Sequence, residues 1–215
     1  MSSTRLPGKV LTDIGSGETM LALMLRRLER ARSLERIVVA TSDDPSDDVI
    51  AASKGSVPVY RGPLHDVLAR YVGAIGDHDG VVVRVTADCP LIDPEIVDGV
   101  VGLMKPGIAY ASNVDPRSYP KGLDTEAFRP EALRDLAAES TDPAEREHVT
   151  LGLRARPERW PAASLVREGE NLGDLRWTVD TPEDLEHVRA IVKALGDRRY
   201  EAGLDEILAV TPSPT

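Results

Sequence analysis

The chain is most strand-like at Gly80-Val81-Val82-Val83-Arg84-Val85, and the segment that follows reads Thr86-Ala87-Asp88-Cys89-Pro90-Leu91-Ile92-Asp93. The apolar run predicts a β-strand, and Asp88 lies just beyond its carboxyl end. In an open α/β sheet the ligand crevice lies at those ends, where a carboxylate is well placed to hold a hard cation. An Asp there is equally typical of a turn or a helix N-cap, so both interpretations stay open.

Two neighbours of Asp88 have simpler interpretations. Cys89 is the only cysteine, and we expect a small buried residue because nothing nearby in the sequence lowers the pKa of its thiol. It can form neither an internal disulfide nor, alone, a cysteine-type zinc site. Asp93 precedes Pro94 and is expected to cap a helix.

Apolar runs and helical patterns alternate on either side of this stretch, which is typical of an α/β fold. Residues 36–41 (RIVVAT) predict a buried central strand of a parallel sheet, because their apolar run is uninterrupted. Pro58 marks the strand expected at 57–60 as an edge or a strand start. We expect helices at 20–28, 43–53, 64–75, 94–104, 130–139, 143–155, 182–195 and 199–209, and further strands at 108–112, 162–166 and 175–179.

Composition excludes several classes of protein. The 215 residues are 41% hydrophobic and 29% charged, which is ordinary for a globular domain and excludes disordered and collagen-like chains. We expect one domain over residues 1–210 and a disordered tail over 211–215. No apolar run approaches the roughly 20 residues of a membrane span, and no signal segment is recognisable, so we expect a cytoplasmic protein without membrane contact. The net charge of -10 argues against nucleic acid as a partner.

The N-terminal loop Ser2-Ser3-Thr4-Arg5-Leu6-Pro7-Gly8-Lys9 combines small residues with two cations. Hydroxyls, backbone N–H groups and two positive charges on a tight turn are typical of a phosphate cradle. The loop lacks the spacing of an ordinary P-loop. A disordered basic terminus is the alternative.

A second carboxylate follows a predicted strand at Asp180. The strand expected at 175–179 ends there, and a helix begins at once with Thr181 as cap and Pro182 in its first turn. Glu183 and Asp184 are explained as acids of that first turn, where the helix dipole favours them. Asp180 repeats the position of Asp88 at a strand end, so the two carboxylates could clamp one metal ion between them.

The segment 119–128 carries a third group of polar side chains. Alternation places Asp124 and Glu126 on one face of an extended segment. A solvated sheet face is one interpretation. The other is a polar wall for a substrate with hydroxyl or amino groups, to which Lys121 adds an anion contact, with Arg146 and His148 as further members.

Seven phrases, taken in order, carry a resemblance to a known family. They are STRLPGK (3–9), IVVATSD (37–43), YRGPLHDVLARY (60–71), RVTADCPLIDP (84–94), YPKGLDTEAF (119–128), REHVT (146–150) and RWTVDTPEDL (176–185). The set resembles the cytidylyltransferase family that includes CMP-Kdo and CMP-sialic acid synthetases, and most closely its spore coat polysaccharide biosynthesis protein F branch. The resemblance runs from Ser3 to about Val192.

The resemblance implies a fold and a reaction. The fold is a Rossmann-like nucleotide-diphospho-sugar transferase (GT-A-like) three-layer sandwich around a mixed, mainly parallel sheet. The reaction is in-line attack of a hydroxyl of an acidic sugar on the α-phosphorus of CTP, which releases pyrophosphate, in surface polysaccharide biosynthesis. Mg²⁺ is the implied cofactor, and because relatives commonly dimerise, a homodimer is compatible with it.

The resemblance also implies roles for particular residues. The catalytic residues are Lys9, Asp88 and Asp180, of which Asp88 and Asp180 match magnesium-binding aspartates. Nucleotide binding falls to Ser3, Arg5, Gly8, Lys9 and Thr86. Acceptor binding falls to Lys121, Asp124, Glu126, Arg146 and His148.

Two departures from the family pattern alter these expectations. Family members usually begin several residues earlier with a hydrophobic strand, so the resemblance implies that the first, central strand and one phosphate-binding arginine are missing. At Asp66-Val67-Leu68, CMP-Kdo synthetases carry an arginine that helps to read the base. Two alternatives therefore stand beside cytidylyl transfer: a GT-A-type glycosyltransferase that uses a nucleotide sugar, and a catalytically impaired nucleotide-binding subunit.

Overall fold

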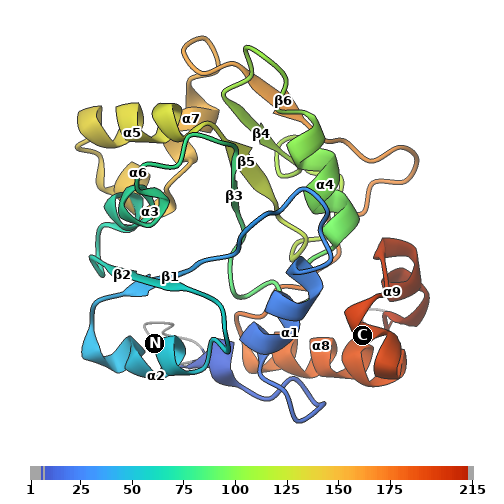
Figure 1. Cartoon of the computed structure of the whole chain (residues 1–215). Coiled ribbons are helices and arrows are strands. Elements are labelled where there is room, and N and C mark those ends of the chain that lie inside the picture. The colour runs from blue at the N-terminus through green and yellow to red at the C-terminus, as the bar shows by residue number, and fades with distance from the viewer. Residues whose placement is uncertain (1–5, 7, 213–215) are drawn as a thin grey trace.

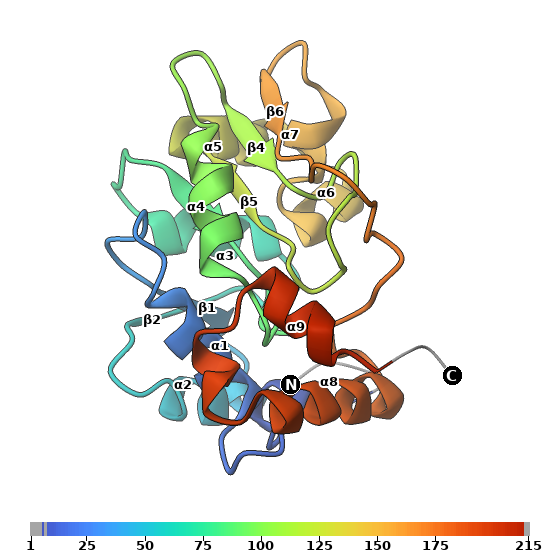
Figure 2. The same ribbon diagram turned by 90° about the vertical axis from the view of Figure 1, so that its right-hand side faces the viewer.

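The computed structural model describes residue 6 and residues 8–212, and in it strands lie between helices on both sides (Figures 1 and 2). The predicted α/β class is confirmed. The predicted roles of Ser3 and Arg5, and most of the predicted tail 211–215, fall on positions outside the described residues. Thr211, expected in that tail, instead ends the last helix and donates a hydrogen bond from its hydroxyl to the carbonyl of Ile207 at 2.7 Å.

The strands form two separate sheets. β1 (Val39–Ser42) pairs in parallel with β2 (Val59–Gly62). The other sheet has the order β3 (Val82–Arg84), β5 (Glu126–Phe128), β4 (Tyr110–Ser112) and β6 (Ala162–Ser164). β5 is antiparallel to β3 and β4, whereas β4 and β6 are parallel, so the sheet is mixed as predicted. Among the described residues, no strand lies between β1 and β3.

The helices follow the predicted order. They are α1 (Met20–Leu28), α2 (Asp48–Ala52), α3 (Val67–Ile75), α4 (Pro94–Gly102), α5 (Pro130–Glu139), α6 (Pro143–His148), α7 (Leu151–Ala155), α8 (Pro182–Leu195) and α9 (Leu204–Val210), with short 3-10 helices η1 (Lys9–Leu11), η2 (Pro45–Asp47) and η3 (Gly196–Tyr200). Asp93 caps α4 as predicted, since its carboxylate accepts the N–H of Glu95. Within the described part of the chain, no helix has the length and apolar character that crossing a membrane requires.

Alternating side chains of the four-stranded sheet pack against helices on its two faces. Tyr110 and Phe128 belong to a core with α3, α5 and α7. Ala111 and Ala127, their neighbours in β4 and β5, pack with α4 on the opposite face. Figure 1 shows α4 on one side of this sheet and α3, α5, α6 and α7 on the other.

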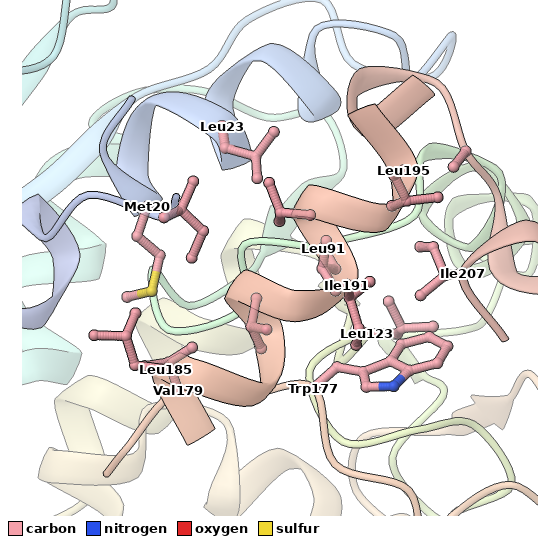
Figure 3. Close-up of a cluster of buried hydrophobic side chains, with 14 of the residues drawn as sticks. Met20, Leu23, Leu91, Leu123, Trp177, Val179, Leu185, Ile191, Leu195 and Ile207 are labelled. Carbon is pink, nitrogen blue, oxygen red and sulfur yellow. The ribbon is translucent and has the colours of Figure 1, made fainter. Parts of the chain in front are cut away.

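The largest core cluster joins the two ends of the chain. Met20 and Leu23 of α1 pack with Leu185 and Ile191 of α8 (Figure 3). Trp177, which is completely buried, lies in the same cluster. This core fixes α1 and α8 together, and with them the segment that leads to Asp180.

Several local predictions were wrong. Residues 36–41 were expected to form a buried central strand, but β1 covers only Val39–Ser42, begins half-buried, and pairs only with β2 among the described residues. Residues 175–179 form an extended segment with one isolated bridge, Lys121 to Arg176, and no strand. The helix expected at 143–155 is broken at Val149, whose φ of 51° ends α6. Glu126 lies on no solvated face, because it is 5% exposed in β5, an inner strand of the four-stranded sheet.

Candidate active site

Two carboxylates far apart in the sequence contact the same cation. Nζ of Lys9 lies 2.7 Å from Oδ1 of Asp180 and 3.4 Å from Oδ2 of Asp88. It also donates a hydrogen bond to the carbonyl of Val179 at 2.8 Å. The Lys9 side chain is only 13% exposed, so its charge is held largely away from solvent between the two acids. The structure therefore brings together the three residues predicted to be catalytic.

Backbone hydrogen bonds hold the two acidic segments side by side. The carbonyl of Asp88 accepts the N–H of Val179 at 2.9 Å and the hydroxyl of Thr178 at 3.2 Å. The hydroxyl of Thr86 donates to Oδ1 of Asp88 at 2.5 Å and orients that carboxylate. Gly8, with φ 72°, turns the chain into η1, so the residue that follows it, Lys9, points toward the acids. These hydrogen bonds hold residues 178–179 beside Asp88, although no strand forms at 175–179.

Arg176 and Asp184 complete the ionic network and were not predicted as site residues. Arg176 donates to Oδ2 of Asp180 at 2.5 Å and to Oδ1 of Asp184 at 2.8 Å. Asp184 also accepts the backbone N–H groups of Asp180 and Thr181, both at 2.9 Å. Thr181-x-x-Asp184 is a capping box, and that sequence signal indicated the cap without indicating the ion pair.

The electrostatics of the site favour ionised carboxylates and a neutral thiol. Burial raises the pKa of Asp180, but the hydrogen bond and charge of Lys9, followed by those of Arg176, outweigh it and hold this pKa below its ordinary value. The pKa of Asp184 is lowered in the same way, mainly by Arg176 against the effect of burial. Burial, then the charge of Asp88, raises the pKa of Cys89 well above its ordinary value, which favours the neutral thiol. Cys89 is buried, as predicted.

The predicted acceptor residues divide between this site and a second cluster. Lys121 joins the site through its backbone, which pairs with Leu175 and Trp177. Asp124 lies in a two-point ion pair with Arg117, at 2.7 and 2.9 Å. Lys121 therefore lies beside the segment that carries Asp180.

The other three predicted acceptor residues, Glu126, Arg146 and His148, lie in β5 and α6. Both oxygens of Glu126 are engaged, because Oε1 accepts from Tyr110 and Thr150 at 2.6 Å and Oε2 from Arg84. Arg146 is paired with Asp66, the cap of α3, so it ties α6 to α3. His148 ends α6 with an exposed side chain, which makes no hydrogen bond among the described residues.

Comparison with known proteins identifies the family. Residues 1–197 match the family model described as cytidylyltransferase. The chain belongs to the cytidylyltransferase family. Spore coat polysaccharide biosynthesis protein SpsF of Bacillus subtilis is 32% identical over 224 residues, which cover 100% of this chain and 92% of that protein. The predicted family is confirmed.

Two further similarities extend over most of this cytidylyltransferase. The 3-deoxy-manno-octulosonate cytidylyltransferase of Anaeromyxobacter dehalogenans is 28% identical over 229 residues, covering 89% of this chain and 94% of that one. The structure of a cytidylyltransferase from Leptospira borgpetersenii matches with a TM-score of 0.90 and 30% identity, covering 100% of this chain and 94% of that one. The predicted fold family is therefore confirmed as well.

Gly122 is required where the segment 119–128 contacts the segment that carries Asp180. Its φ is +109°, and an added Cβ would lie 2.6 Å from the backbone of Trp177 and Thr178. We expect Gly122→Ala to lower the free energy of unfolding by at least about 1–3 kcal/mol, measured by urea denaturation. Gly107→Ala is the matched control, because Gly107 has φ +88° but no atom within 4 Å of the added Cβ. Equal losses in the two variants would show that the close approach contributes nothing.

Acid should weaken the fold through Asp180. Because its pKa is lower in the fold than its ordinary value of 3.8, ionised Asp180 stabilises the fold above that pH. The contribution is lost as pH falls below about 4 and through the folded pKa. We expect Lys9→Met to raise the pKa of Asp180, measured by carboxyl NMR titration, and to reduce the acid-dependent loss of stability. An unchanged Asp180 titration in that variant would contradict the role given to Lys9.

Proposed function

We propose that this protein transfers CMP from CTP to a hydroxyl of an acidic sugar, with release of pyrophosphate, in surface polysaccharide biosynthesis. The observation that carries the proposal is the pair of carboxylates, Asp88 and Asp180, held around the Lys9 ammonium. Membership of the cytidylyltransferase family and the similarity to SpsF support it. The related 3-deoxy-manno-octulosonate cytidylyltransferase supports an acidic sugar as the acceptor.

A divalent cation, which we propose is Mg²⁺, fits the donor set of Asp88 and Asp180. Their oxygens already share one positive charge, and carboxylate oxygen is the ligand that Mg²⁺ prefers. The described residues contain no cluster of three or more metal-ligating side chains. Two carboxylates suit Mg²⁺, which usually keeps water and substrate phosphates as its other ligands. When bound, the ion would neutralise phosphate charge that develops during the transfer.

The remaining work of catalysis is positioning and charge neutralisation by this chain's own residues. Phosphoryl-type transfers need little covalent help from protein. We assign the triphosphate to Lys9, the turn at Gly8 and the hydroxyl of Thr86, together with Ser3 and Arg5. Arg176 keeps Asp180 ionised and oriented through its 2.5 Å hydrogen bond.

The acceptor side is assigned to Lys121, Asp124 and His148. Lys121 supplies a cation for an acidic sugar. Asp124 is paired with Arg117, but its side chain is 34% exposed, so its carboxylate oxygens can accept hydrogen bonds from hydroxyl groups of the sugar as well. Glu126 and Arg146 were predicted to contact the acceptor, but their polar atoms are engaged by protein groups. We propose instead that these two residues hold β5 and α6 in place beside the acceptor.

Lys9 and the metal compete for the same two carboxylates in this proposal. Lys9→Met removes the ammonium that competes for the two carboxylates. It should therefore strengthen binding of Mn²⁺ alone, used as a substitute for Mg²⁺, by about tenfold or more, which corresponds to a gain of about 1.4 kcal/mol in binding free energy. The same variant should lose about a hundredfold in turnover, because it also loses a phosphate contact. Calorimetric titration with MnCl₂ measures the first effect, and Lys193→Met, at an exposed position of α8, is the control. Weaker Mn²⁺ binding in Lys9→Met would contradict this arrangement.

Nucleotide choice tests the proposal without knowledge of the acceptor. With MgCl₂ present, CTP should raise the midpoint of thermal unfolding more than UTP, ATP or GTP at equal concentration, because ligands of the native state stabilise it by mass action. No shift with any of the four nucleotides would contradict the proposal.

A further inference from the structure

Val149 holds a backbone conformation that residues with a side chain rarely adopt. Its φ is 51° and its ψ is -66°, and among the described residues it alone combines a Cβ with a positive φ. Across it, the N–H of Thr150 donates to the carbonyl of His148 at 2.6 Å. A three-residue turn closed by such a hydrogen bond at these angles is the strained form of the γ-turn. The strain is largest for a β-branched side chain such as that of valine.

The helices on both sides of this turn are held by contacts of their own. α6 packs beside α3 and is tied to it by the ion pair of Arg146 with Asp66, at 2.9 Å (Figure 1). α7 is tied back to α6 by the hydrogen bond from Arg156 to Glu145, at 2.6 Å. The Val149 side chain is completely buried in the core cluster that α3, α5 and α7 share. A strained backbone persists only where its surroundings over-determine it, and these contacts do so.

The turn directs its two flanking residues to different environments. His148 has an exposed side chain at the end of α6, whereas Thr150 is 3% exposed. Thr150 is the N-cap residue of α7, where a threonine hydroxyl ordinarily accepts a hydrogen bond from a helix N–H. It makes no such bond and instead donates to Oε1 of Glu126 at 2.6 Å. The hydroxyl of Thr150 therefore ties the turn to β5 and leaves α7 without this cap.

Through Thr150, the turn links two residues that are assigned to the acceptor side. Glu126 is the first residue of β5 and stands two positions after Asp124. His148 stands two positions before Thr150. The link consists of Val149, Thr150 and Glu126, and each of them is at most 5% exposed. Their packing therefore fixes the position of His148 relative to Asp124.

We propose that Val149 is a positioning residue of the acceptor side, whose strained turn fixes His148 relative to Asp124. The inference rests on the proposed function, since only that function assigns these two residues to the sugar. Glycine would form the turn without strain, but it has no side chain to hold the turn in the core. Valine forms the turn with strain, and its buried isopropyl group anchors the turn. Because the turn is already ordered, no free energy of sugar binding is lost in ordering it.

Two substitutions at Val149 test the strain without any substrate. Alanine keeps a Cβ and therefore the strain, whereas glycine removes it. We expect Val149→Gly to unfold at a temperature higher than that of Val149→Ala by about 2 °C or more. At Val100, which is completely buried in α4, we expect the opposite order, because glycine destabilises a helix relative to alanine. A lower unfolding temperature for Val149→Gly than for Val149→Ala would overturn the strained turn.

Steady-state kinetics test the positioning. With 3-deoxy-manno-octulosonate, or another acidic sugar that the parent chain uses, Val149→Gly should raise the KM for the sugar about fivefold or more and leave the KM for CTP unchanged. Thr150→Val removes the hydroxyl but keeps the shape, so it should have the same effect, whereas Thr150→Ser should behave like the parent chain. Val100→Ala loses stability on the opposite face of the sheet and should change neither KM.

The outcomes separate this inference from the proposed function. An unchanged KM for the sugar in Val149→Gly, or an equal rise in the KM for CTP, would overturn the positioning role while CMP transfer stands. No turnover of any acidic sugar by the parent chain would overturn the proposed function and the positioning role together. The order of unfolding temperatures would still decide whether the turn is strained.

Discussion

Asp88→Asn should lower the turnover of CTP by about two to three orders of magnitude while leaving the fold intact. The substitution keeps the size of the side chain but removes the negative charge that faces Lys9 and would face the metal. Asp180→Asn should have a similar effect, because that carboxylate holds Lys9 more closely, at 2.7 Å. Initial rates of pyrophosphate release measure both losses.

The fold of these variants is checked by thermal unfolding. Asp79→Asn is the matched control, since Asp79 is exposed and makes no hydrogen bond or ion pair among the described residues. It should retain full turnover. Turnover like that of the parent chain in Asp88→Asn or Asp180→Asn would remove that residue from the site.

Glu126→Ala should lower the urea concentration at which the protein unfolds, and this is the largest loss of stability that we expect. Its side chain is 7% exposed and joins Arg84, Tyr110 and Thr150 in one network. Truncation leaves the Arg84 cation without its partner, which costs about 3–5 kcal/mol for a buried pair. That loss is a large part of the stability of an ordinary domain, which is about 5–15 kcal/mol. Urea denaturation measures it.

A second variant separates this structural role from acceptor binding. Glu126→Gln keeps the shape and two polar atoms, so it should fold and lose less stability than Glu126→Ala. Glu131→Ala, at an exposed first-turn position of α5, should cost at most about 1 kcal/mol of stability and leave turnover unchanged. A Glu126→Ala protein as stable as the parent, with a raised KM for the acceptor, would instead establish direct contact with the sugar.

The sequence predicted the starts of helices correctly where a proline or a capping residue marks them. α5 and α8 begin at Pro130 and Pro182 as expected, and the Thr181 cap fixes the start of α8. The break at Val149 was missed, because a β-branched residue at positive φ has no signature in sequence. The half-burial of Val81 and Val83 was also missed, since an apolar run describes the environment of a complete sheet and not the one that this chain builds.

The site was predictable in part. Asp88 and Asp180 were found by their place after apolar segments, although the second segment is held by hydrogen bonds to Asp88 and is no strand. The position of Lys9 between them was not predictable, because sequence alone assigns its charge to phosphate. Arg176 was missed because its ion pairs with Asp180 and Asp184 depend on the extended backbone before α8, which the sequence did not predict.

The reaction itself is tested most directly by ³¹P NMR of the products. The protein is incubated with CTP, MgCl₂ and a panel of acidic sugars that includes 3-deoxy-manno-octulosonate. Cytidylyl transfer predicts pyrophosphate and a CMP-sugar in equal amounts with at least one acceptor, and neither product with Asp88→Asn. Turnover only of a preformed nucleotide sugar, without pyrophosphate, would contradict the account and identify a glycosyltransferase.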